Sequence, residues 1–370
     1  MDGSLHGSAM AQACKGRGAL SSPPCRYDRF VSVAVDDGWG TLEQEMRDPP
    51  PLPTTLTRDA TRRVIAWNDS PDIGFDRAVN PYRGCEHGCI YCYARPSHAW
   101  LGLSPGLDFE TKLLFKPDAA RLLARELSRP GYVPRPIALG SNTDPYQPVE
   151  RRLGITRAIL DVLLTARHPC IIVTKSALVL RDLDVLTEMA RHRLVRVHLS
   201  VTTLDRRLAR LMEPRAATPG RRLQAIAELA AAGVPSGVLA APMIPGLNDA
   251  ELERILEAAA RAGATSAAYV LLRLPNELRE LFTEWLTTHY PERAARVLAL
   301  IRETRAGRLN DPRFGTRFTG EGVYAATLAR RFQIAARRLG LDGPRAGLES
   351  SAFTPPRRWQ GAEAPQLALL

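Results

Sequence analysis

The sequence contains no apolar run that approaches the ~20 residues needed to cross a bilayer. Its amino-terminal residues also lack the apolar core of a secretory signal. Both absences argue against a membrane or secreted protein, so we expect the chain to work in the cytoplasm. Its 370 residues, 45% hydrophobic and 24% charged, are typical of a globular protein with one large domain plus additions, or with two domains.

Cysteine is scarce, with only six in the whole chain. Cys14, Cys25 and Cys170 each stand alone in the sequence, far from any other cysteine. None of them belongs to a second C-x2-C pair, which is the pattern of zinc ribbons and of ferredoxins with two clusters. These two classes of protein are therefore not indicated.

The other three cysteines, Cys85, Cys89 and Cys92, share one short glycine-containing stretch with C-x3-C-x2-C spacing. Thiolates this close can converge on one soft metal centre, and the gaps are too short for efficient disulfides across a folded domain. Three thiolates leave one iron of a 4Fe-4S cluster open. An open position on a metal centre is where substrate or cofactor chemistry takes place, so we interpret the motif as a catalytic iron–sulfur site.

Two other interpretations of the motif stay open at this point. The three thiolates and either His87 or His98 would make an ordinary set of zinc ligands. His87 lies inside the x3 gap, however, where its side chain has difficulty joining the same tetrahedron. The cysteines are alternatively buried apolar side chains, which their clustering beside Gly84 and Gly88 disfavours.

Positive charge is concentrated near the carboxyl terminus. The chain has a net charge of +11, and residues 291–370 contain 14 arginines and no lysine against 7 acidic residues. Arginine suits bidentate contact with phosphate, so this surplus fits a polyanion. In residues 313–318 arginine also alternates with phenylalanine, a pattern that suits base stacking or the pinning of a loop. The alternative explanations of this arginine surplus are a GC-rich genome and arginines on solvent-exposed helix faces.

Alternating strand and helix patterns begin at residue 77. The predicted strands cover residues 77–82, 136–140, 170–174, 196–202, 235–240 and 266–272. The predicted helices between and after them cover residues 117–128, 154–166, 181–191, 205–211, 219–232 and 250–262. Apolar strands that alternate with helices predict an α/β fold in which helices cover a parallel sheet.

The two ends of the chain have a different composition. Residues 1–76 are rich in Gly, Ser, Pro and Asp and predict an irregular extension before a main domain at 77–275. Helices are expected at 276–288, 291–305 and 321–339, which form a helical extension over 276–342 on the open side of the sheet. Residues 343–370 return to Pro, Gly and Ser and predict a disordered tail.

Polar residues follow three of the predicted strands. Thr143 and Asp144 follow the second strand, Lys175 follows the third, and Ser200 lies near the end of the fourth. In parallel α/β folds the chemistry lies at the carboxyl ends of the strands. These side chains suit a cationic, hydroxyl-rich ligand with a carboxylate, whereas helix capping and a surface lysine are the structural alternatives.

The cysteine motif, with Tyr91 before the last cysteine, resembles the signature of radical S-adenosylmethionine (SAM) enzymes. The resemblance implies a partial (β/α)6 TIM-type barrel and a 4Fe-4S cluster on Cys85, Cys89 and Cys92. It also implies that SAM binds the open iron and is cleaved to a 5'-deoxyadenosyl radical, which abstracts hydrogen from the substrate. The electron would come from an external one-electron donor of the flavodoxin or ferredoxin type.

The strand-end residues, Glu213-Pro214 and the run from Ala241 to Asp249 further resemble the branch related to spore photoproduct lyase, often called DNA repair photolyase-like. This resemblance covers about residues 79–272. It implies that Tyr93 takes part in radical transfer and that Tyr91 packs by the adenine. It also implies contacts to SAM from Thr143, Asp144, Lys175 and Ser200.

One position departs from that branch. Asn142 stands where the lyase has the cysteine that donates a hydrogen atom to the product radical. An amide cannot replace a thiol in this step, so thymine-dimer reversal is not expected. We therefore expect a radical SAM enzyme of lyase or oxidoreductase type with nucleic acid as the favoured substrate. A peptide or small metabolite is the enzymatic alternative, and a zinc-stabilised nucleic-acid-binding module or an iron–sulfur carrier is the alternative outside enzymes.

Overall fold

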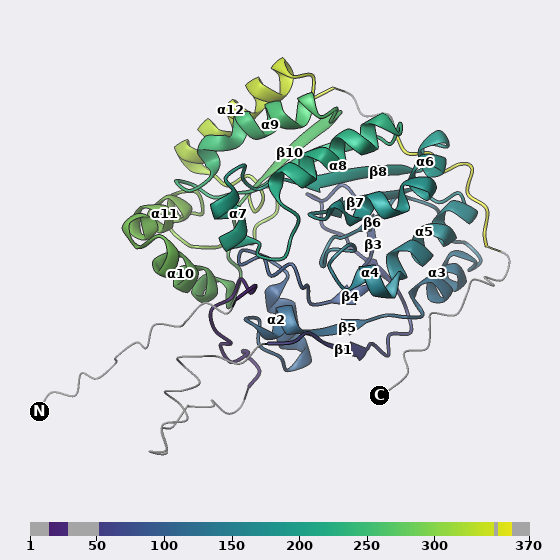
Figure 1. Ribbon diagram of the computed structural model, residues 1–370, viewed down its shortest axis with the longest axis horizontal. Helices are drawn as coiled ribbons and strands as arrows, with labels where there is room; N and C mark the ends of the chain where they lie inside the picture. Colours follow the sequence, from purple (N-terminus) through teal and green to yellow (C-terminus); the bar gives the residue numbers. More distant parts are fainter. Residues whose placement is uncertain (1–14, 29–51, 344–346, 357–370) are drawn as a thin grey trace, which may run out of the picture.

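The structure is a computed structural model that describes residues 15–28, 52–343 and 347–356 (Figure 1). Its centre is a 7-stranded sheet in the order β10-β9-β8-β7-β6-β3-β2. All neighbouring strands run parallel except β2, which pairs antiparallel with β3. The strands are β2 (Ile65–Trp67), β3 (Arg77–Val79), β6 (Ile137–Leu139), β7 (Cys170–Thr174), β8 (Val195–Ser200), β9 (Ser236–Met243) and β10 (Ser266–Leu271).

This sheet confirms the predicted α/β class. Six of its strands are the predicted parallel ones, and no described residues pair β10 with β2, so the sheet is open rather than a closed barrel. One face of the central strand β8 is apolar, with the buried Val195, Val197 and Leu199 beneath the helices, whereas Arg196, His198 and Ser200 alternate with them on the other face.

The outer face of the sheet is covered by amphipathic helices (Figure 1). In α9 the buried residues Leu252, Ile255, Leu256 and Ala259 recur at helical spacing and form the stripe that packs on β9. The helices of this layer are α3 (Ala119–Leu127), α4 (Glu150–Leu153), α5 (Ile155–Thr165), α6 (Leu183–Arg191), α8 (Pro219–Ala231) and α9 (Leu252–Arg261). The 3-10 helices η2 (Ala177–Asp182) and η3 (Asp249–Glu251) lead into α6 and α9.

A second, 3-stranded sheet has the order β1-β5-β4 and lies beside the main one. It contains β1 (Thr55–Arg58), β4 (Tyr82–Arg83) and β5 (Lys112–Phe115). The single strand predicted at 77–82 is therefore two strands in different sheets. They separate at Pro81, which has no N–H for a ladder, and its carbonyl accepts a bond from Lys116 N at 3.0 Å. β1 and β2 also lie in the extension that was predicted to be irregular.

Three helices follow the main sheet, and the first two of them cover the loop that contains the three cysteines. These helices are α10 (Leu278–His289), α11 (Pro291–Glu303) and α12 (Gly322–Arg338), close to their predicted bounds. Ile90 and Tyr91 share a buried cluster with Phe282 and Trp285 of α10 and with Val297 of α11. α12 packs on α9 at the far end of this layer. The helical extension is thus part of the wall of the site.

Residues 347–356 differ from the predicted disorder of the carboxyl-terminal tail. The Phe353 ring lies 5.6 Å from that of Tyr132 and 5.5 Å from that of His168, and Thr354 N donates to Ala166 O at 2.9 Å. An aromatic anchor and a backbone bond therefore fix this piece to the outer layer. Cys14 and residues 357–370 lie outside the described residues. In the described part of the chain, no helix is long and apolar enough to cross a membrane.

The buried His168 makes stability depend on pH. Its Nδ1 donates to the Pro169 carbonyl at 3.0 Å, and its Nε2 accepts from the Tyr132 hydroxyl at 2.8 Å. Burial lowers the pKa of His168 to about 4. The pKa in the unfolded chain is about 6.5, so the unfolded state takes up the proton first as the pH falls. The contribution to stability is complete above pH ~6.5 and is lost progressively towards pH ~4.

We expect His168 alone to remove about 2 kcal/mol of unfolding free energy between pH 7.5 and pH 5.0. In urea denaturation, the His168→Gln protein should lose that much less than the unmodified protein over the same interval. His192→Gln, at a partly exposed histidine on the surface, is the control and should behave like the unmodified protein. An identical pH dependence in His168→Gln would contradict the assignment.

Candidate metal and cofactor centre

The three cysteines lie in a loop, residues 84–95, that follows β4 and runs into the 3-10 helix η1 (Arg95–Leu101). The loop is tied to its surroundings by backbone bonds from Cys85 N to Phe109 O at 2.9 Å and from Ile90 N to Met212 O at 3.0 Å. None of the three thiols is in a disulfide. Burial raises the pKa of each thiol, and a coordinating metal would supply the positive charge that stabilises the thiolates.

Two glycines give the cysteine loop its shape. Gly84 and Gly88 have φ of +78° and +67°, a region that other residues rarely adopt. A Cβ on Gly84 would lie 2.8 Å from the Phe109 carbonyl oxygen, and one on Gly88 would lie 2.6 Å from Glu110 Oε2. Neither position has room for a side chain, so the loop passes closely against the short helix α2 (Asp108–Thr111).

A buried ion pair between Arg95 and Glu110 holds the loop from inside. Arg95 Nε donates to Cys89 O at 2.8 Å and Nη2 to Gly88 O at 3.1 Å. Glu110 also accepts from the backbone N–H groups of Gly18 and Ala19, at 2.9 Å and 2.8 Å. An amino-terminal segment is thereby attached to the outside of the loop. Sequence reasoning missed both residues, because no periodic pattern connects them.

Asp144 was predicted to bind the cofactor. In the structure, both oxygens of its carboxylate accept hydrogen bonds from the protein. Its Oδ1 accepts from the Thr174 hydroxyl and its Oδ2 from Lys175 N, both at 2.7 Å. His87 Nδ1 lies 3.3 Å from Oδ2, without the geometry of a hydrogen bond. Burial opposes ionisation of Asp144, but His87 and these hydrogen bonds outweigh it, and the pKa is lowered. Asp144 therefore joins the ends of β6 and β7 to the cysteine loop.

Lys175 places an ammonium group beside the cysteines. Its Nζ lies 5.6 Å from the centre of the Tyr91 ring, in a cation–π contact. Within the described part of the chain it has no salt bridge with a carboxylate. Burial lowers its pKa, whereas the nearby Cys89 and Asp144 act in the opposite direction. A half-buried ammonium without a paired carboxylate is suited to a ligand carboxylate.

The Tyr91 ring is held by a second buried network. Its hydroxyl donates to Glu213, which also accepts from Thr202 Oγ1 at 2.5 Å and forms an ion pair with Arg222. Glu213 and Arg222 are only 2% and 1% exposed. The hydroxyl of Tyr91 is therefore used inside the protein, and the residue as a whole is 6% exposed.

The remaining predicted site residues lie at the same carboxyl edge of the sheet. Thr143 is buried and donates through Oγ1 to Tyr82 O at 2.9 Å, so its hydroxyl is also occupied. Ser200 ends β8, and its carbonyl accepts from Arg222 at 2.9 Å. Tyr93 is 45% exposed, and its hydroxyl donates to the carbonyl of Ser141.

Asn142, the residue at the position of the expected thiol, lies in the loop after β6. Its backbone N–H donates to Asn80 Oδ1 at 3.0 Å. Thr143 and Asp144 follow it directly in the sequence. This loop therefore contributes an amide, a hydroxyl and a carboxylate to the edge of the site.

The donor set suits a cluster better than a single ion. Among residues 15–28, 52–343 and 347–356, no three His, Cys, Asp or Glu side chains gather as ligands of one metal ion. The zinc ligands considered above are not assembled, and His98 Nε2 instead lies 3.0 Å from Lys112 O. Thiolates of a 4Fe-4S cluster bind separate irons and need not meet at one point. Three thiols on one loop beside Lys175 fit that cluster with a carboxylate-bearing cofactor.

Comparison with protein families and relatives agrees with this geometry. Residues 79–259 match the model of the Radical SAM superfamily. An uncharacterized protein of Mycobacterium tuberculosis is 39% identical over 232 residues, which are 62% of this chain and 68% of that protein. An uncharacterized protein of Methanocaldococcus jannaschii is 28% identical over 178 residues, which are 48% of this chain and 64% of that one.

Solved structures share the fold. A mutant of spore photoproduct lyase superimposes with a TM-score of 0.55 at 17% identity, over 77% of this chain and 79% of that chain. A second lyase structure, with bound AdoMet and dinucleoside spore photoproduct, gives a TM-score of 0.54 at 16% identity over 77% and 79%. At this level of identity the similarity concerns the fold.

Loss of the charge on Glu110 should destabilise the protein before any cofactor is bound. Glu110→Gln keeps the volume of the side chain but leaves Arg95 buried without its partner, at a cost of about 3–5 kcal/mol. Urea denaturation of the metal-free protein would measure this cost without a contribution from metal binding. The control is Glu188→Gln, which breaks an exposed pair with Arg191 and should leave the midpoint unchanged. Equal midpoints for both variants would refute the role of the buried pair.

Proposed function

This chain belongs to the radical SAM superfamily, and we propose from this premise that Cys85, Cys89 and Cys92 hold a 4Fe-4S cluster that acts on SAM. The observation that carries the proposal is the set of three unpaired thiols at the carboxyl edge of a parallel sheet, with the Lys175 ammonium beside them. When bound, the cluster and SAM supply a 5'-deoxyadenosyl radical that abstracts hydrogen from a substrate.

Lys175 and Tyr91 are the residues best suited to hold SAM. The ammonium of Lys175 binds the carboxylate of its methionine part, because the side chain has no carboxylate partner within the described protein. The Tyr91 ring, fixed by Glu213, forms a flat wall for the adenine. Ser200 lines the same edge at the end of β8.

Thr143 and Asp144 act on the cofactor through the shape of the site. The Thr143 hydroxyl and both carboxylate oxygens of Asp144 already have protein partners. They hold the loop after β6 against the cysteine loop and the end of β7. The reactive carbon of the cofactor is thereby kept at a fixed position relative to the substrate.

The protein also shields the site from water. Ile90 and Tyr91 are buried against Phe282 and Trp285 of α10, so one side of the cysteine loop faces an apolar core. Exclusion of water protects a radical from side reactions. The carboxyl-terminal helices therefore contribute to the chemistry as well as to the fold.

Tyr93 and Asn142 set the chemistry at the substrate side. Tyr93 follows the last cysteine directly and is half exposed, a position suited to radical transfer between cofactor and substrate. Asn142 offers no thiol as a hydrogen donor. The substrate in the solved lyase is therefore not carried over to this chain, and the product radical requires another route.

Nucleic acid is the proposed class of substrate. Residues 291–370 have an excess of 7 positive charges, from 14 arginines against 7 acidic residues. Arginine and aromatic side chains also meet beside Tyr93, where Arg273 stacks on its ring. The electron comes from an external donor of flavodoxin or ferredoxin type. A peptide or small metabolite is the enzymatic alternative.

Reconstitution under anaerobic conditions tests the proposed reaction. The protein should bind about four irons per chain and form 5'-deoxyadenosine when dithionite and SAM are added. Cys89→Ala should lose both properties, whereas Cys170→Ala, a buried cysteine of β7, should keep both. Zinc in place of iron would refute the cluster, and iron without cleavage of SAM would indicate an iron–sulfur carrier.

Lys175→Met tests the proposed carboxylate contact. Loss of one charged hydrogen bond, worth about 1.5–3 kcal/mol, should raise the KM for SAM about 10- to 100-fold. The iron content should not change, because Lys175 is not a ligand. Lys112→Met, at an exposed lysine that pairs with Asp108, is the matched control. An unchanged KM in Lys175→Met would refute this contact.

A further inference from the structure

Two segments beside the site contain arginine and aromatic side chains whose arrangement bears on the proposed class of substrate. The first, residues 272–279, follows β10 at the carboxyl edge of the sheet. The second, residues 302–318, contains the end of α11 and the loop towards α12. We refer to them as the β10 exit and the α11 loop.

Arg305 joins the β10 exit to the α11 loop. It is fully buried, and its Nη2 donates to the carbonyls of Leu271 and Leu272, both at 2.8 Å. Its Nη1 donates to the carbonyls of Thr316 and Arg317, at 3.0 Å and 2.8 Å. A buried guanidinium with backbone bonds on both sides fixes the two segments as one surface.

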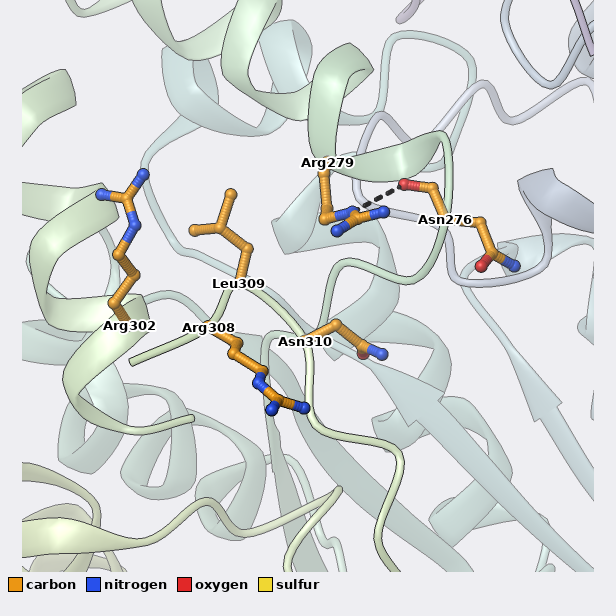
Figure 2. Close-up of a pocket in the computed structure, with 6 residues that line it drawn as sticks. All are labelled: Asn276, Arg279, Arg302, Arg308, Leu309 and Asn310. Carbon is orange, nitrogen blue, oxygen red and sulfur yellow. Dashed lines mark hydrogen bonds between the residues drawn. The ribbon is translucent and has the colours of Figure 1, made fainter. Parts of the chain in front are cut away.

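A pocket of about 370 Å³ lies between these segments (Figure 2). Figure 2 shows three arginine side chains around it, Arg279 from α10, Arg302 from α11 and Arg308 from the α11 loop. The other residues that line it are Asn276, Leu309 and Asn310, so its walls contain no carboxylate.

The three guanidinium groups of this arginine pocket have no neutralising partner within the described residues. Arg279 Nε donates to the Asn276 carbonyl at 3.1 Å, and no salt bridge involves Arg279, Arg302 or Arg308. Three arginines without an acidic residue among the lining residues make the pocket electropositive, which favours an anion. Guanidinium groups bind phosphate oxygens in bidentate geometry, so the pocket suits a phosphate group.

A stack of alternating aromatic and guanidinium groups extends from Tyr93 along the same surface. Arg273 lies over the Tyr93 ring at 4.9 Å and over the Phe318 ring at 5.1 Å from the ring centres. Arg317 lies 4.8 Å from the centres of both the Phe318 and Phe314 rings. Phe314, at the end of the stack, is 58% exposed.

Arg273 and Arg317 differ in their partners. Arg317 forms an ion pair with Asp72, at 2.5 Å between Nη2 and Oδ1. Arg273 makes no salt bridge or hydrogen bond through its side chain in the described part of the chain, and burial lowers its pKa. Rings that cover the faces of a guanidinium leave the N–H groups at its edge available to a ligand.

We propose that the arginine pocket and this stack bind the phosphodiester backbone of a single-stranded nucleic acid, with Arg273 contacting the phosphate nearest to Tyr93. The proposal rests on the proposed function, because Tyr93 marks the place of the reacting nucleotide. The pocket receives a phosphate farther along the strand, and Phe314 stacks on an unpaired base. An acidic peptide would use the arginines but not the exposed ring.

The salt dependence of binding tests the arginine pocket. A fluorescent single-stranded oligodeoxynucleotide is titrated with the reconstituted protein at several salt concentrations. Arg279→Ala, Arg302→Ala and Arg308→Ala together should reduce the slope of log K against log salt by ~0.7, the value for the one phosphate that the pocket receives. All three side chains are exposed, so the triple variant should fold.

The matched control removes the same charge from the opposite end of the strands, where their amino termini lie. Arg191 and Arg261 are exposed residues at the carboxyl ends of α6 and α9, and the exposed Arg129 lies two residues after α3; these segments lead into the starts of β8, β10 and β6. Their triple replacement by alanine should leave the slope unchanged. Equal losses in both triple variants, or no loss in either, would overturn the proposed pocket.

Arg273 is tested by two substitutions. Arg273→Met should weaken binding and reduce the slope by ~0.7, the value for one phosphate on a single strand. Arg273→Lys keeps the charge but loses the planar fork, so it should weaken binding with little change in slope. Binding that is equal in all three proteins would overturn the contact between Arg273 and a phosphate.

Competition experiments identify the source of the phosphate. An unlabelled oligonucleotide should displace the probe at far lower concentration than inorganic phosphate or a mononucleotide. Equal competition by a mononucleotide would mean a nucleotide site, and equal competition by polyglutamate would mean a site for acidic peptides. Either result overturns the proposal. Formation of deoxyadenosine by the unmodified protein is measured separately. The deoxyadenosine assay tests the radical reaction and the binding assay tests the substrate class, so the failure of one can be distinguished from the failure of the other.

Discussion

The ion pair between Arg95 and Glu110 is the interaction on which the site depends most. Both side chains are fully buried, and Arg95 donates to carbonyls of the loop that contains the three cysteines. A loop with three thiols and two glycines has little internal structure of its own. The Arg95–Glu110 pair holds the loop in its conformation. A conformation that left either charge buried without its partner would cost several kcal/mol. Glu110 extends the same restraint to Gly18 and Ala19.

Around this pair, the site is assembled from elements that are distant in sequence. Asp144 connects the loop after β6 with β7, and Glu213 connects Tyr91 with Arg222 of α8. On the opposite side, Trp285 of α10 packs into the cluster that contains Tyr91. The cysteine loop is therefore held by buried polar networks on one side and by an apolar core on the other. In the proposed function, the cofactor and the substrate bind on the side of Lys175 and Tyr93.

The distribution of charge around the site follows a consistent pattern. Near the cysteines the arginines are neutralised, as Arg95 and Arg222 are by buried glutamates. Near the mouth, Arg273 and the arginine pocket have no such partners among the described residues. Paired charges hold the fold together, whereas unpaired charges are available to a ligand. In the proposed function, these unpaired arginines lie on the side that receives the substrate.

The sequence by itself determined whatever depends on local spacing. The three cysteines fall in one loop because their spacing is short, and β7 covers residues 170–174 as predicted, because its run is apolar and β-branched. Tertiary structure alone decided the second sheet, where β1 pairs with β5, and the contacts of Arg95, Arg305 and Phe353. Each of these depends on partners that only the folded chain brings together. Periodicity records the face that a residue buries, but it does not record which distant residue lies opposite.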